Sequence, residues 1–316
     1  MTGQNLRPRV LEQDRISVPV SDNRTESPSP CLKMRKVGQM KTKLTVVVDN
    51  IAGNDETMGE LPGEWGLSIL AEYNDKRILA DVGATGLFAT NLKKLGFDIK
   101  DVDYATLSHA HYDHAGGMKH FFEENQKAKF YVRETADEKC YKKKYFFKAY
   151  IGTPRGVMKK YDDRIEIISG DYPLCDGAYL IPHKTKGLEA VGEREKMYRR
   201  TPRGWKPDDF SHEQSLVLDT DKGLVIINCC CHGGVVNIIN EVKSTFPDKH
   251  IFAIIGGFHL FNKSDDEVQN VAKMIEQTGI DYVWTGHCTK DRAYKIMKEE
   301  LGEKITQLHV GMKMEF

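Results

Sequence analysis

The chain has 316 residues, of which 40% are hydrophobic and 29% are charged. This composition is typical of a globular protein with a buried core, arranged as one large domain or two small ones. Lysine plus arginine and aspartate plus glutamate number 46 each, so the formal charge is zero. A neutral chain argues against a protein that binds polyanions through its overall charge.

The sequence also indicates the cellular compartment in which we expect the protein. No apolar run approaches the roughly 20 residues that a membrane-spanning helix needs, and the N-terminus lacks the apolar core of a signal peptide. Seven cysteines, three of them adjacent at Cys229, Cys230 and Cys231, do not form the spaced pattern of a disulfide framework. We therefore expect a protein of the reducing cytoplasm that does not associate with a membrane.

The first 40 residues differ in composition from the rest of the chain. They are polar, contain Ser27-Pro28-Ser29-Pro30 and show no helical or strand period. Such a segment cannot bury enough apolar surface to offset the entropy lost on ordering. We expect a disordered leader over residues 1–40 and a folded domain over residues 41–316.

Short strands dominate the chain from Lys43 onward. Apolar and β-branched runs predict strands over residues 44–48, 66–73, 77–80 and 129–132. Asn74-Asp75 predicts a hairpin turn between the second and third of these strands. Short helices are expected over residues 87–95, closed by Gly96, and over residues 118–122.

Between these strands, residues 106–118 read Thr-Leu-Ser-His-Ala-His-Tyr-Asp-His-Ala-Gly-Gly-Met. Neutral imidazole nitrogen and carboxylate oxygen are ligands of a borderline divalent cation such as zinc. If a strand ends just before the histidines, His109 and His111 point to one side, because strand side chains repeat every second residue. A turn then brings Asp113 and His114 to a second point nearby. One loop can therefore supply two ligands to each of two metal ions.

Two basic segments, residues 139–160 and 193–209, contain aromatic residues and show no regular period. Long irregular segments in a compact domain are typically lids or binding loops. The alternative is a solvated charged face. As binding loops they would favour an anionic substrate through four arginines: Arg155, Arg199, Arg200 and Arg203.

The second half of the chain alternates strands and helices, as in α/β folds. Strands are predicted over residues 215–218, 223–228, 251–255 and 282–285. One helix should begin just after His232, and another follows the capping box of Ser264 and Glu267. Three strands of this half are followed by a histidine: His232, His259 and His287. Strand ends gather at one edge in such folds, so these histidines point to the same site as the histidine loop.

The string from His109 to His114, running into Ala115-Gly116-Gly117, resembles the signature of the metallo-β-lactamase superfamily. The resemblance covers the chain from about residue 43 to its end. It implies an α/β fold, a four-layer αββα sandwich, with a dinuclear metal site. His287, in Gly286-His287, would bind the second metal. Asp81 would buttress the metal-binding loop, although an ordinary turn aspartate fits the sequence equally well.

The sequence departs from the superfamily pattern at two places. Glu213 stands where relatives carry the third histidine of the first metal site, with His212 one residue earlier. The next strand would end in a bridging aspartate, and here it ends in Cys229-Cys230-Cys231-His232. These departures resemble the branch of metal-dependent hydrolases related to dihydropterin ribofuranosylaminobenzene phosphate synthase. That branch carries Cys-x-His-x-Gly-x-x-Asn, Gly-Gly-Phe-His-Leu and Thr-Gly-His-Cys-Thr, found here at residues 230–237, 256–260 and 285–289.

Either Glu213 or His232 could complete the first site, and we expect His232, because a third imidazole keeps the charge and softness of the site like those of the relatives. Glu213 would then accept a hydrogen bond from a ligand imidazole. The expected metal ligands are His109, His111, Asp113, His114, His232 and His287. Asp113 and His259 are the candidate catalytic residues, and His259 would protonate a leaving group or hold a substrate carboxylate or phosphate.

Two divalent ions a few ångströms apart lower the pKa of a bridging water towards neutrality, giving hydroxide without a protein base. The sequence therefore predicts a hydrolase of an ester, lactone or phosphoester bond in a small anionic substrate, with pterin- or ribosyl-phosphate-related compounds as candidates. His111 favours zinc, because resembling diiron proteins carry a glutamate there; iron and manganese are the alternatives.

Two rival functions remain. A nuclease or phosphodiesterase of the same superfamily would suit the basic aromatic segments, but the neutral charge and the lack of an evident RNA-binding appendage argue against a nucleic-acid partner. A metal-binding protein without hydrolytic activity is disfavoured, because structural zinc sites are normally closed by cysteine-rich ligand sets. The sequence leaves the oligomeric state open.

Overall fold

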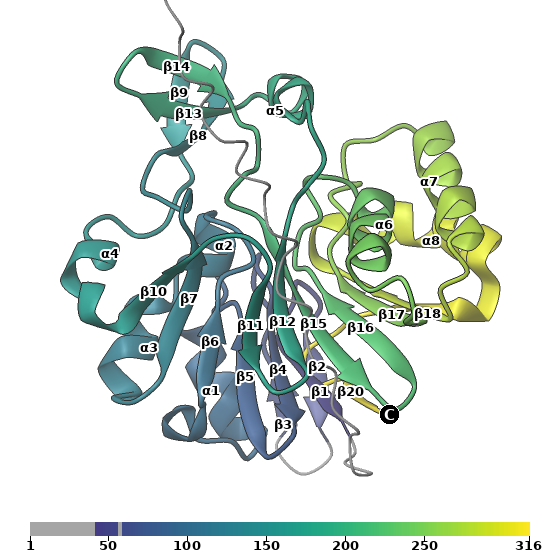
Figure 1. Cartoon of the computed structure of the whole chain (residues 1–316), viewed down its shortest axis with the longest axis horizontal. Coiled ribbons are helices and arrows are strands. Elements are labelled where there is room, and N and C mark those ends of the chain that lie inside the picture. The colour runs from purple at the N-terminus through teal and green to yellow at the C-terminus, as the bar shows by residue number, and fades with distance from the viewer. Residues whose placement is uncertain (1–41, 56–58) are drawn as a thin grey trace, which may run out of the picture. The chain divides into compact units, whose positions relative to one another are not determined.

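The computed structural model describes residues 42–55 and 59–316. The leader expected over residues 1–40 lies outside these described residues. Two seven-stranded β-sheets form the centre of the fold (Figure 1). Within this part of the chain, no helix has both the length and the apolar character needed to cross a membrane.

The first sheet contains most of the N-terminal strands and the last strand of the chain. Its order is β10-β7-β6-β5-β4-β1-β20. In that order the strands span Ile165–Ile168, Lys129–Arg133, Tyr104–Thr106, Lys76–Ala80, Ser68–Tyr73, Lys43–Val48 and Lys313–Glu315. The turn between β4 and β5 has positive φ angles at Asn74 (48°) and Asp75 (59°), as the favoured two-residue hairpin turn requires. The predicted hairpin is confirmed.

The second sheet contains the strands that precede the three C-terminal histidines. Its order is β11-β12-β15-β16-β17-β18-β19. These strands span Tyr172–Cys175, Ala178–Pro182, Gln214–Thr220, Gly223–Ile227, Ile251–Gly256, Tyr282–Thr285 and Ile305–Gln307. Strands β16 to β19 are parallel. Their carboxyl ends therefore meet at one edge, which brings His232, His259 and His287 to the same side of the sheet.

The two sheets pack face to face around one apolar core. Leu44 and Ile69 of the first sheet and Leu218, Ile227 and Ile255 of the second are at most 1% exposed in this core. Each such side chain stabilises the fold by about 1.5–3 kcal/mol relative to exposure. The core explains why the strand segments are so uniformly apolar.

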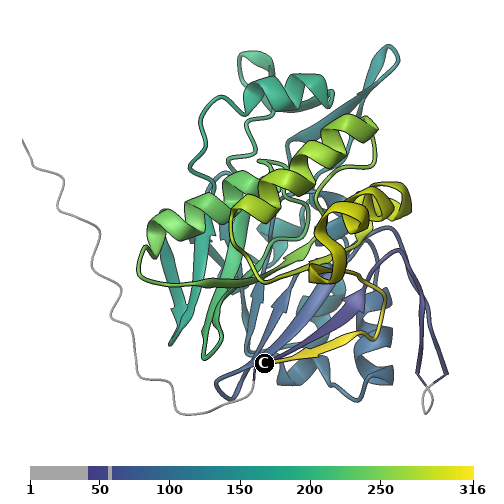
Figure 2. The same cartoon turned by 90° about the vertical axis from the view of Figure 1, so that its right-hand side faces the viewer.

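Helices cover the outer faces of both sheets. The helices α1 (Leu87–Lys94), α3 (Met118–Glu124) and α4 (Val157–Lys160) pack on the first sheet. The helices α6 (Val235–Thr245), α7 (Asp265–Gln277) and α8 (Lys290–Leu301) lie along the second sheet (Figures 1 and 2). The result is an α/β fold with four layers in the order αββα, as the resemblance implied.

Shorter elements connect these layers. They are the ribbon of β2 (Gly53–Asp55) and β3 (Gly59–Leu61), helix α2 (Tyr112–Ala115), and 3₁₀ turns at Ile99–Asp101, Asp162–Arg164, His287–Thr289 and Gly302–Lys304. Helix α2 matters most for the site, because it carries the second half of the histidine loop.

The interpretation of residues 139–160 and 193–209 as irregular loops is wrong. They contain a four-stranded antiparallel sheet in the order β14-β13-β8-β9, formed by Gly204–Pro207, Met197–Thr201, Cys140–Lys144 and Phe147–Tyr150. Helix α5 (Glu189–Arg194) accompanies this small sheet at the upper end of Figure 1. The period of two was hidden because lysines and arginines alternate with aromatic residues on its strands, so neither face looks apolar.

The small sheet has two distinct faces. Tyr141, Tyr198 and Trp205 share one face, because Tyr141 pairs with Tyr198 and Arg200 pairs with Trp205 across the strands. Cys140 and Lys142 alternate onto the other face. This second face is directed at the region of the histidines, because Cys140 Sγ lies 3.7 Å from Nε2 of His212, which directly precedes β15.

The capping box of α7 offers a test of the local sequence analysis. Ser264 Oγ accepts the Glu267 N–H at 3.3 Å, and the Glu267 carboxylate accepts the Ser264 N–H at 2.8 Å. Ser264→Ala should lower the free energy of unfolding by about 1 kcal/mol, because one orphan helix N–H loses its acceptor. Urea denaturation would measure this loss.

Ser244→Ala provides the control, because the exposed Ser244 hydroxyl only donates to Asn240 O within α6. It should change stability by a few tenths of a kcal/mol at most, roughly the size of an ordinary surface substitution. Equal effects of the two substitutions would contradict the role of the capping box.

Candidate metal centre

The histidine loop begins directly after β6. His109, His111, Asp113 and His114 are between 0% and 8% exposed, although three are histidines and one is an acid. The rings of His109 and His111 have centroids 4.6 Å apart. The one-turn helix α2 then carries Asp113 and His114 round to a second position, as the spacing predicted.

The first cluster of ligand atoms comes from His109, His111 and His232. One ring nitrogen of each lies within 4.8 Å of the other two. His232 follows β16, and its ring centroid is 4.8 Å from that of His109 and 4.8 Å from that of His111. Nε2 of His109, Nε2 of His111 and both nitrogens of His232 are buried without a hydrogen-bond partner among the described residues. Each unsatisfied buried nitrogen costs about 1–3 kcal/mol, a cost that a shared cation would remove.

Burial keeps these three imidazoles neutral. It lowers the pKa of His111 to about 3, and it holds the pKa values of His109 and His232 well below the usual range. Neighbouring imidazoles lower the values of His109 and His232 further. A neutral imidazole keeps the lone pair that a metal ion needs. The first cluster therefore fits a divalent cation in both geometry and protonation.

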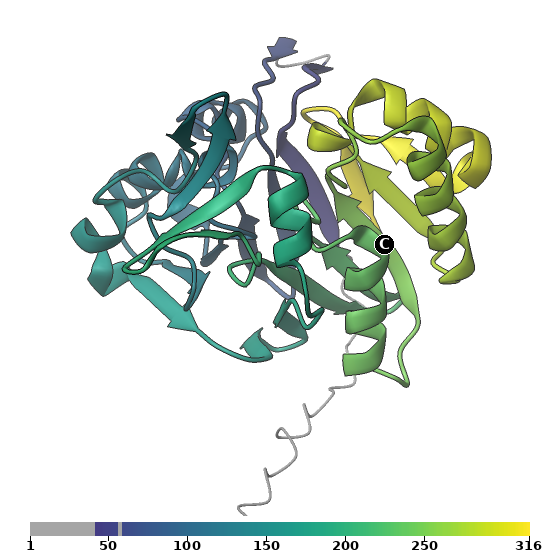
Figure 3. The ribbon, with the colours of Figure 1, turned by 90° about the horizontal axis from the view of Figure 1, so that it is seen from above.

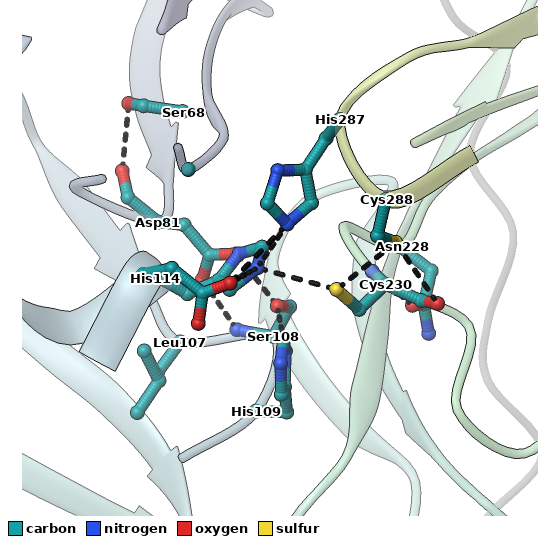
Figure 4. A network of polar contacts seen from close by, with 12 residues as sticks. Ser68, Asp81, Leu107, Ser108, His109, His114, Asn228, Cys230, His287 and Cys288 are labelled. Carbon is teal, nitrogen blue, oxygen red and sulfur yellow. Dashed lines mark hydrogen bonds and ion pairs between the residues drawn. The ribbon is translucent and has the colours of Figure 1, made fainter. Parts of the chain in front are cut away.

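The second cluster comes from Asp113, His114 and His287, and Figure 4 shows the rings of His114 and His287 directed at each other. Asp113 Oδ2 is 3.8 Å from His114 Nε2 and 3.4 Å from His287 Nε2, and the two Nε2 atoms are 3.2 Å apart. Two nitrogens bound to one tetrahedral zinc ion at about 2.0–2.1 Å lie roughly 3.3 Å apart. Burial would raise the pKa of Asp113, but His114 and His287 outweigh burial and lower it, which keeps the carboxylate ionised.

Asp81 orients the second cluster through His114. Its Oδ2 accepts the Nδ1–H of His114 at 2.7 Å, which leaves the His114 Nε2 lone pair facing the cluster. Its Oδ1 accepts the Ser108 N–H at 2.7 Å. The Ser108 hydroxyl donates to Asp81 Oδ2 at 2.6 Å and lies 2.9 Å from His109 Nδ1. The sequence allowed two interpretations of Asp81. These hydrogen bonds favour a residue that supports the metal-binding loop over an ordinary turn aspartate.

His287 is oriented by two residues that the sequence analysis missed. Asn50 Oδ1 accepts from His287 Nδ1 at 3.1 Å, and Asp49 Oδ2 accepts the His287 N–H at 2.9 Å. Both follow β1, 237 or 238 residues before His287. Because Asn50 and Asp81 occupy the Nδ1 positions of His287 and His114, the two Nε2 lone pairs point at each other. Only a proton or a metal ion between them makes that contact favourable.

Glu213 supports the first cluster in a way that differs from the prediction. Its carboxylate accepts the backbone N–H groups of His232 (2.8 Å) and Gly233 (2.9 Å) rather than a hydrogen bond from a ligand imidazole. His183 forms an ion pair with Glu213 through Nε2, and its Nδ1 is 3.0 Å from Glu241 Oε2. Burial would lower the pKa of His183, but the two carboxylates outweigh burial and raise it to about 10. The His183 cation therefore offsets the buried Glu213 charge.

The structure also brings His259 to the centre. Its ring centroid is 4.3 Å from that of His232, and both of its ring nitrogens are buried without a hydrogen-bond partner within the described residues. His259 Nε2 is 3.7 Å from Glu195 Oε2, on the segment between α5 and β13. The residue has a φ of 51°, so its side chain leaves the strand end in an unusual direction.

His212 lies near the centre with both ring nitrogens already engaged. Nδ1 accepts the N–H of Ala110 at 3.1 Å, and Nε2 is 3.3 Å from Asp208 Oδ2. His212 therefore supports the backbone between His109 and His111 and offers no free lone pair.

Three of the four arginines expected to favour an anionic substrate have other partners, and one of these is Arg200, 5.0 Å from the ring of Trp205. Arg199 is 6% exposed and binds Asp137 Oδ1 at 2.7 Å and Thr135 O at 2.6 Å, so its assignment to the substrate was wrong. Arg155 stacks over the ring of Tyr150 at 4.2 Å. A cation that the sequence analysis did not single out, Lys142, has its Nζ 5.6 Å from the ring of Phe261, which in turn lies 5.0 Å from the ring of His259.

Comparison with known proteins agrees with this geometry. A family model described as the metallo-beta-lactamase superfamily matches residues 66–236, more than half of the chain. The chain belongs to this superfamily. The match spans β4 to the start of α6, and therefore includes the histidine loop and His232.

Two relatives cover most of the chain. The chain is 28% identical over 272 residues to a Methanocaldococcus jannaschii protein named 7,8-dihydropterin-6-methyl-4-(beta-D-ribofuranosyl)-aminobenzene-5'-phosphate synthase, covering 79% of this chain and 90% of that protein. The solved structure of Tm1679, a metal-dependent hydrolase of the beta-lactamase superfamily, is 28% identical with a TM-score of 0.74, covering 87% of this chain and 99% of that one.

A more distant structure shares the fold alone. A diphosphatase from the PhnP family has a TM-score of 0.53 at 14% identity, covering 87% of this chain and 98% of that one. These matches confirm the expected superfamily and its αββα sandwich.

The hydrogen bonds of Asp81 lead to a prediction about metal affinity. Asp81→Asn should weaken zinc binding by about 10- to 100-fold, because the amide no longer fixes the tautomer and orientation of His114. Competition with a chromophoric chelator would measure the affinity. Asp281→Asn is the matched control, since among the described residues Asp281 pairs with the exposed His250 alone, at 2.6 Å. Wild-type affinity in the Asp81 variant would refute this role.

Proposed function

We propose that this protein is a metal-dependent hydrolase that uses two divalent ions, with zinc as the expected metal and iron or manganese as alternatives. The observation that carries the proposal is the convergence of two buried sets of ligand atoms. The first set comes from His109, His111 and His232, and the second comes from Asp113, His114 and His287. Membership of a superfamily whose members are generally hydrolases supports the same conclusion.

When bound, a pair of such ions supplies an activated water at neutral pH and polarises the oxygen of the bond under attack. The residues of the chain then orient the substrate and move protons. Asp113 stays ionised and contributes negative charge to the centre. His259, whose ring nitrogens have no partner among the described residues, is placed to hold a substrate oxyanion or to protonate a leaving group.

Lys142 supports the proposal of a small anionic substrate. Lys142 projects from the same face of the small sheet as Cys140 and is half-buried beside Phe261. In the described part of the chain, no carboxylate lies within ion-pair distance of its ammonium group. Burial lowers its pKa, while Glu195 and Asp113 oppose that shift. A cation that is partly desolvated and unpaired attracts a phosphate or carboxylate more strongly than an exposed one.

The proposed bond is an ester, lactone or phosphoester. The name of the M. jannaschii relative contains a dihydropterin and a ribofuranosyl phosphate, which makes pterin- and ribosyl-phosphate-related compounds the first candidates to test. We place the reaction in the cytoplasm, with a small molecule rather than a membrane or a nucleic acid as partner.

One observation favours the second candidate, a nuclease or phosphodiesterase. The face of the small sheet that carries Tyr141 and Trp205 combines aromatic rings with cations. Lys148 lies 4.7 Å and Arg200 lies 5.0 Å from the ring of Trp205. A cavity of about 340 Å³ on this face is lined by Tyr141, Lys143, Phe146, Phe147, Lys148, Arg200 and Trp205. Such surfaces can bind single-stranded nucleic acid through stacking and phosphate contacts.

The proposal predicts both metal content and a substrate. Protein purified with zinc should carry about two metal equivalents per chain, and chelation should abolish hydrolysis of a chromogenic substrate. Elemental analysis and a panel of phosphomonoester, phosphodiester, lactone and thioester substrates would measure these outcomes. His250→Ala is the surface control. A folded preparation that stays metal-free under zinc supplementation would refute the proposal, whereas cleavage of oligonucleotides alone would favour the nuclease.

The assignment of the third ligand of the first cluster can be tested separately. His232→Ala should remove about one metal equivalent, because only two protein ligands remain in the first cluster. Glu213→Gln should weaken binding without abolishing it, since the amide oxygen can still accept one of the two backbone N–H groups. Elemental analysis after dialysis would distinguish the variants. Loss of metal from the Gln variant together with retention in the Ala variant would reverse the assignment.

A further inference from the structure

A cavity of about 540 Å³ adjoins the second cluster of the centre. His287 forms part of its wall, together with Asn50, Trp65, Phe261 and Lys290. The Nε2 atom of the same His287 ring is directed at the second cluster. A molecule in the cavity would therefore touch a ring that belongs to the centre. Cavities of roughly 300–1,000 Å³ with apolar walls and a few polar groups are typical of small-molecule sites.

Two aromatic rings form a corner of this cavity. Trp65 and Phe261 meet edge to face, with ring centroids 6.3 Å apart and an interplanar angle of 88°. Both are only partly buried, so part of each ring is open to a ligand. The Trp65 ring is also 4.7 Å from the ring of His287, and the Phe261 ring is 5.0 Å from the ring of His259. A flat ligand can stack on one wall and meet the other edge-on, the two arrangements that aromatic pairs prefer.

Close backbone contacts hold Trp65 in place. Gly66 packs against the histidine loop, where an added Cβ would lie 2.6 Å from Asp113 O. An added Cβ at Gly63 would lie 2.7 Å from Asp49 O. Only glycine allows the backbone to approach this closely. The chain on both sides of Trp65 is therefore fixed relative to residues of the centre.

Lys290 supplies a positive charge beside the aromatic corner. Its Nζ lies 5.0 Å from the ring of Trp65, and among the described residues no carboxylate lies within ion-pair distance of it. Its φ of 58° is a conformation that a residue with a Cβ rarely adopts. Such backbone conformations persist where the surrounding structure imposes them, and they are concentrated at functional sites.

The other charged side chains that line the cavity, Glu64, Asp291 and Arg292, already have partners. Glu64 accepts two backbone N–H groups at 3.0 and 3.2 Å, Asp291 accepts a side-chain amide at 2.7 Å, and Arg292 pairs with an aspartate. Within the described part of the chain, Lys290 is therefore the charged group of the lining that is available to a ligand.

We infer that this cavity is the substrate subsite of the centre and that it takes a flat aromatic ring carrying an anionic group. Trp65 selects the ring, and Lys290 attracts the charge. The inference rests on the proposed hydrolase and names the class of its substrate. Because His287 and Phe261 connect the corner with the second cluster and with His259, a bond adjacent to the bound ring lies near these groups.

Calorimetric titration of the intact, zinc-loaded protein with two phosphonates tests the subsite. Phenylphosphonate and cyclohexylphosphonate have the same charge and similar size, and their carbon–phosphorus bond resists hydrolysis. We expect phenylphosphonate to bind about 3- to 10-fold more tightly, because only the phenyl ring can stack on an aromatic wall. Trp65→Leu should abolish this preference, and Trp65→Phe should retain it. Trp205→Leu, the control in the small sheet, should leave the preference unchanged.

A lysine substitution tests the charge. Lys290→Gln should weaken the binding of both phosphonates by about 3- to 5-fold, the effect of one exposed charge. The dependence of binding on salt should fall at the same time. Lys295→Gln is the matched control, because Lys295 is exposed on the same helix and does not line the cavity. Equal effects of the two substitutions would contradict the role of Lys290.

The outcomes separate this inference from the proposed function. Equal affinity of the wild-type protein for the two phosphonates, or no binding of either, would overturn the subsite even if a tryptophan variant fails to fold. A preference that survives Trp65→Leu and disappears in Trp205→Leu would overturn it as well, since the ring would then bind at the small sheet. A protein that prefers phenylphosphonate but hydrolyses none of the substrates in the panel would refute the proposed function and leave the ring-binding site intact.

Discussion

The buried ring nitrogens of the histidines impose the main physical constraint on this structure. His109, His111, His232 and His259 each have at least one buried nitrogen without a partner in the described part of the chain. His114 and His287 direct their Nε2 atoms at each other. Each unsatisfied nitrogen costs free energy, so the surrounding structure must hold these rings against their tendency to find water. The apolar core between the sheets provides that stability.

The sandwich distributes the orienting groups between its two sheets. Asp81 and Asn50 follow strands of the first sheet and fix the tautomers of His114 and His287. Glu213 precedes β15 of the second sheet and holds the backbone of His232. Figure 3 shows the two sheets and the connections above them from the top. Neither sheet alone could orient the complete set of ligands.

Local patterns in the sequence predicted the central strands of both large sheets and the histidine loop, whereas the order of the four layers was implied by the family resemblance. The loop from His109 to His114 could be recognised because its four polar side chains lie within six residues, and the short helix α2 carries two of them, Asp113 and His114. The helix after Ser264 was predicted because its capping box is a local interaction. His232 and His287 were found because parallel strands end at a common edge.

Residues that act over long distances were harder to predict. Asn50 contacts His287 from 237 residues away, and nothing in its local sequence marks it as an orienting group. His183 has no motif, and its importance follows only from its position between Glu213 and Glu241. The small sheet was missed because cations replace the apolar residues expected on one face. The resemblance implied an aspartate at the strand end that residues 229–232 occupy, and only the spatial arrangement shows that the Cys230 sulfur lies near ligand atoms of both clusters.

The separation between ligands along the chain has a consequence for folding. His114 and His287 meet across 173 residues, so an ion held between them would act as a cross-link that closes most of the folded chain into a loop. Closing a loop of that length lowers the conformational entropy of the unfolded chain by the equivalent of only about 5 kcal/mol at 25 °C. The centre can also form only after the strand preceding His287 has been synthesised and has joined its sheet. Metal binding would thus be a late step of folding, and removal of the metal would weaken the connection between the histidine loop and the C-terminal third of the chain.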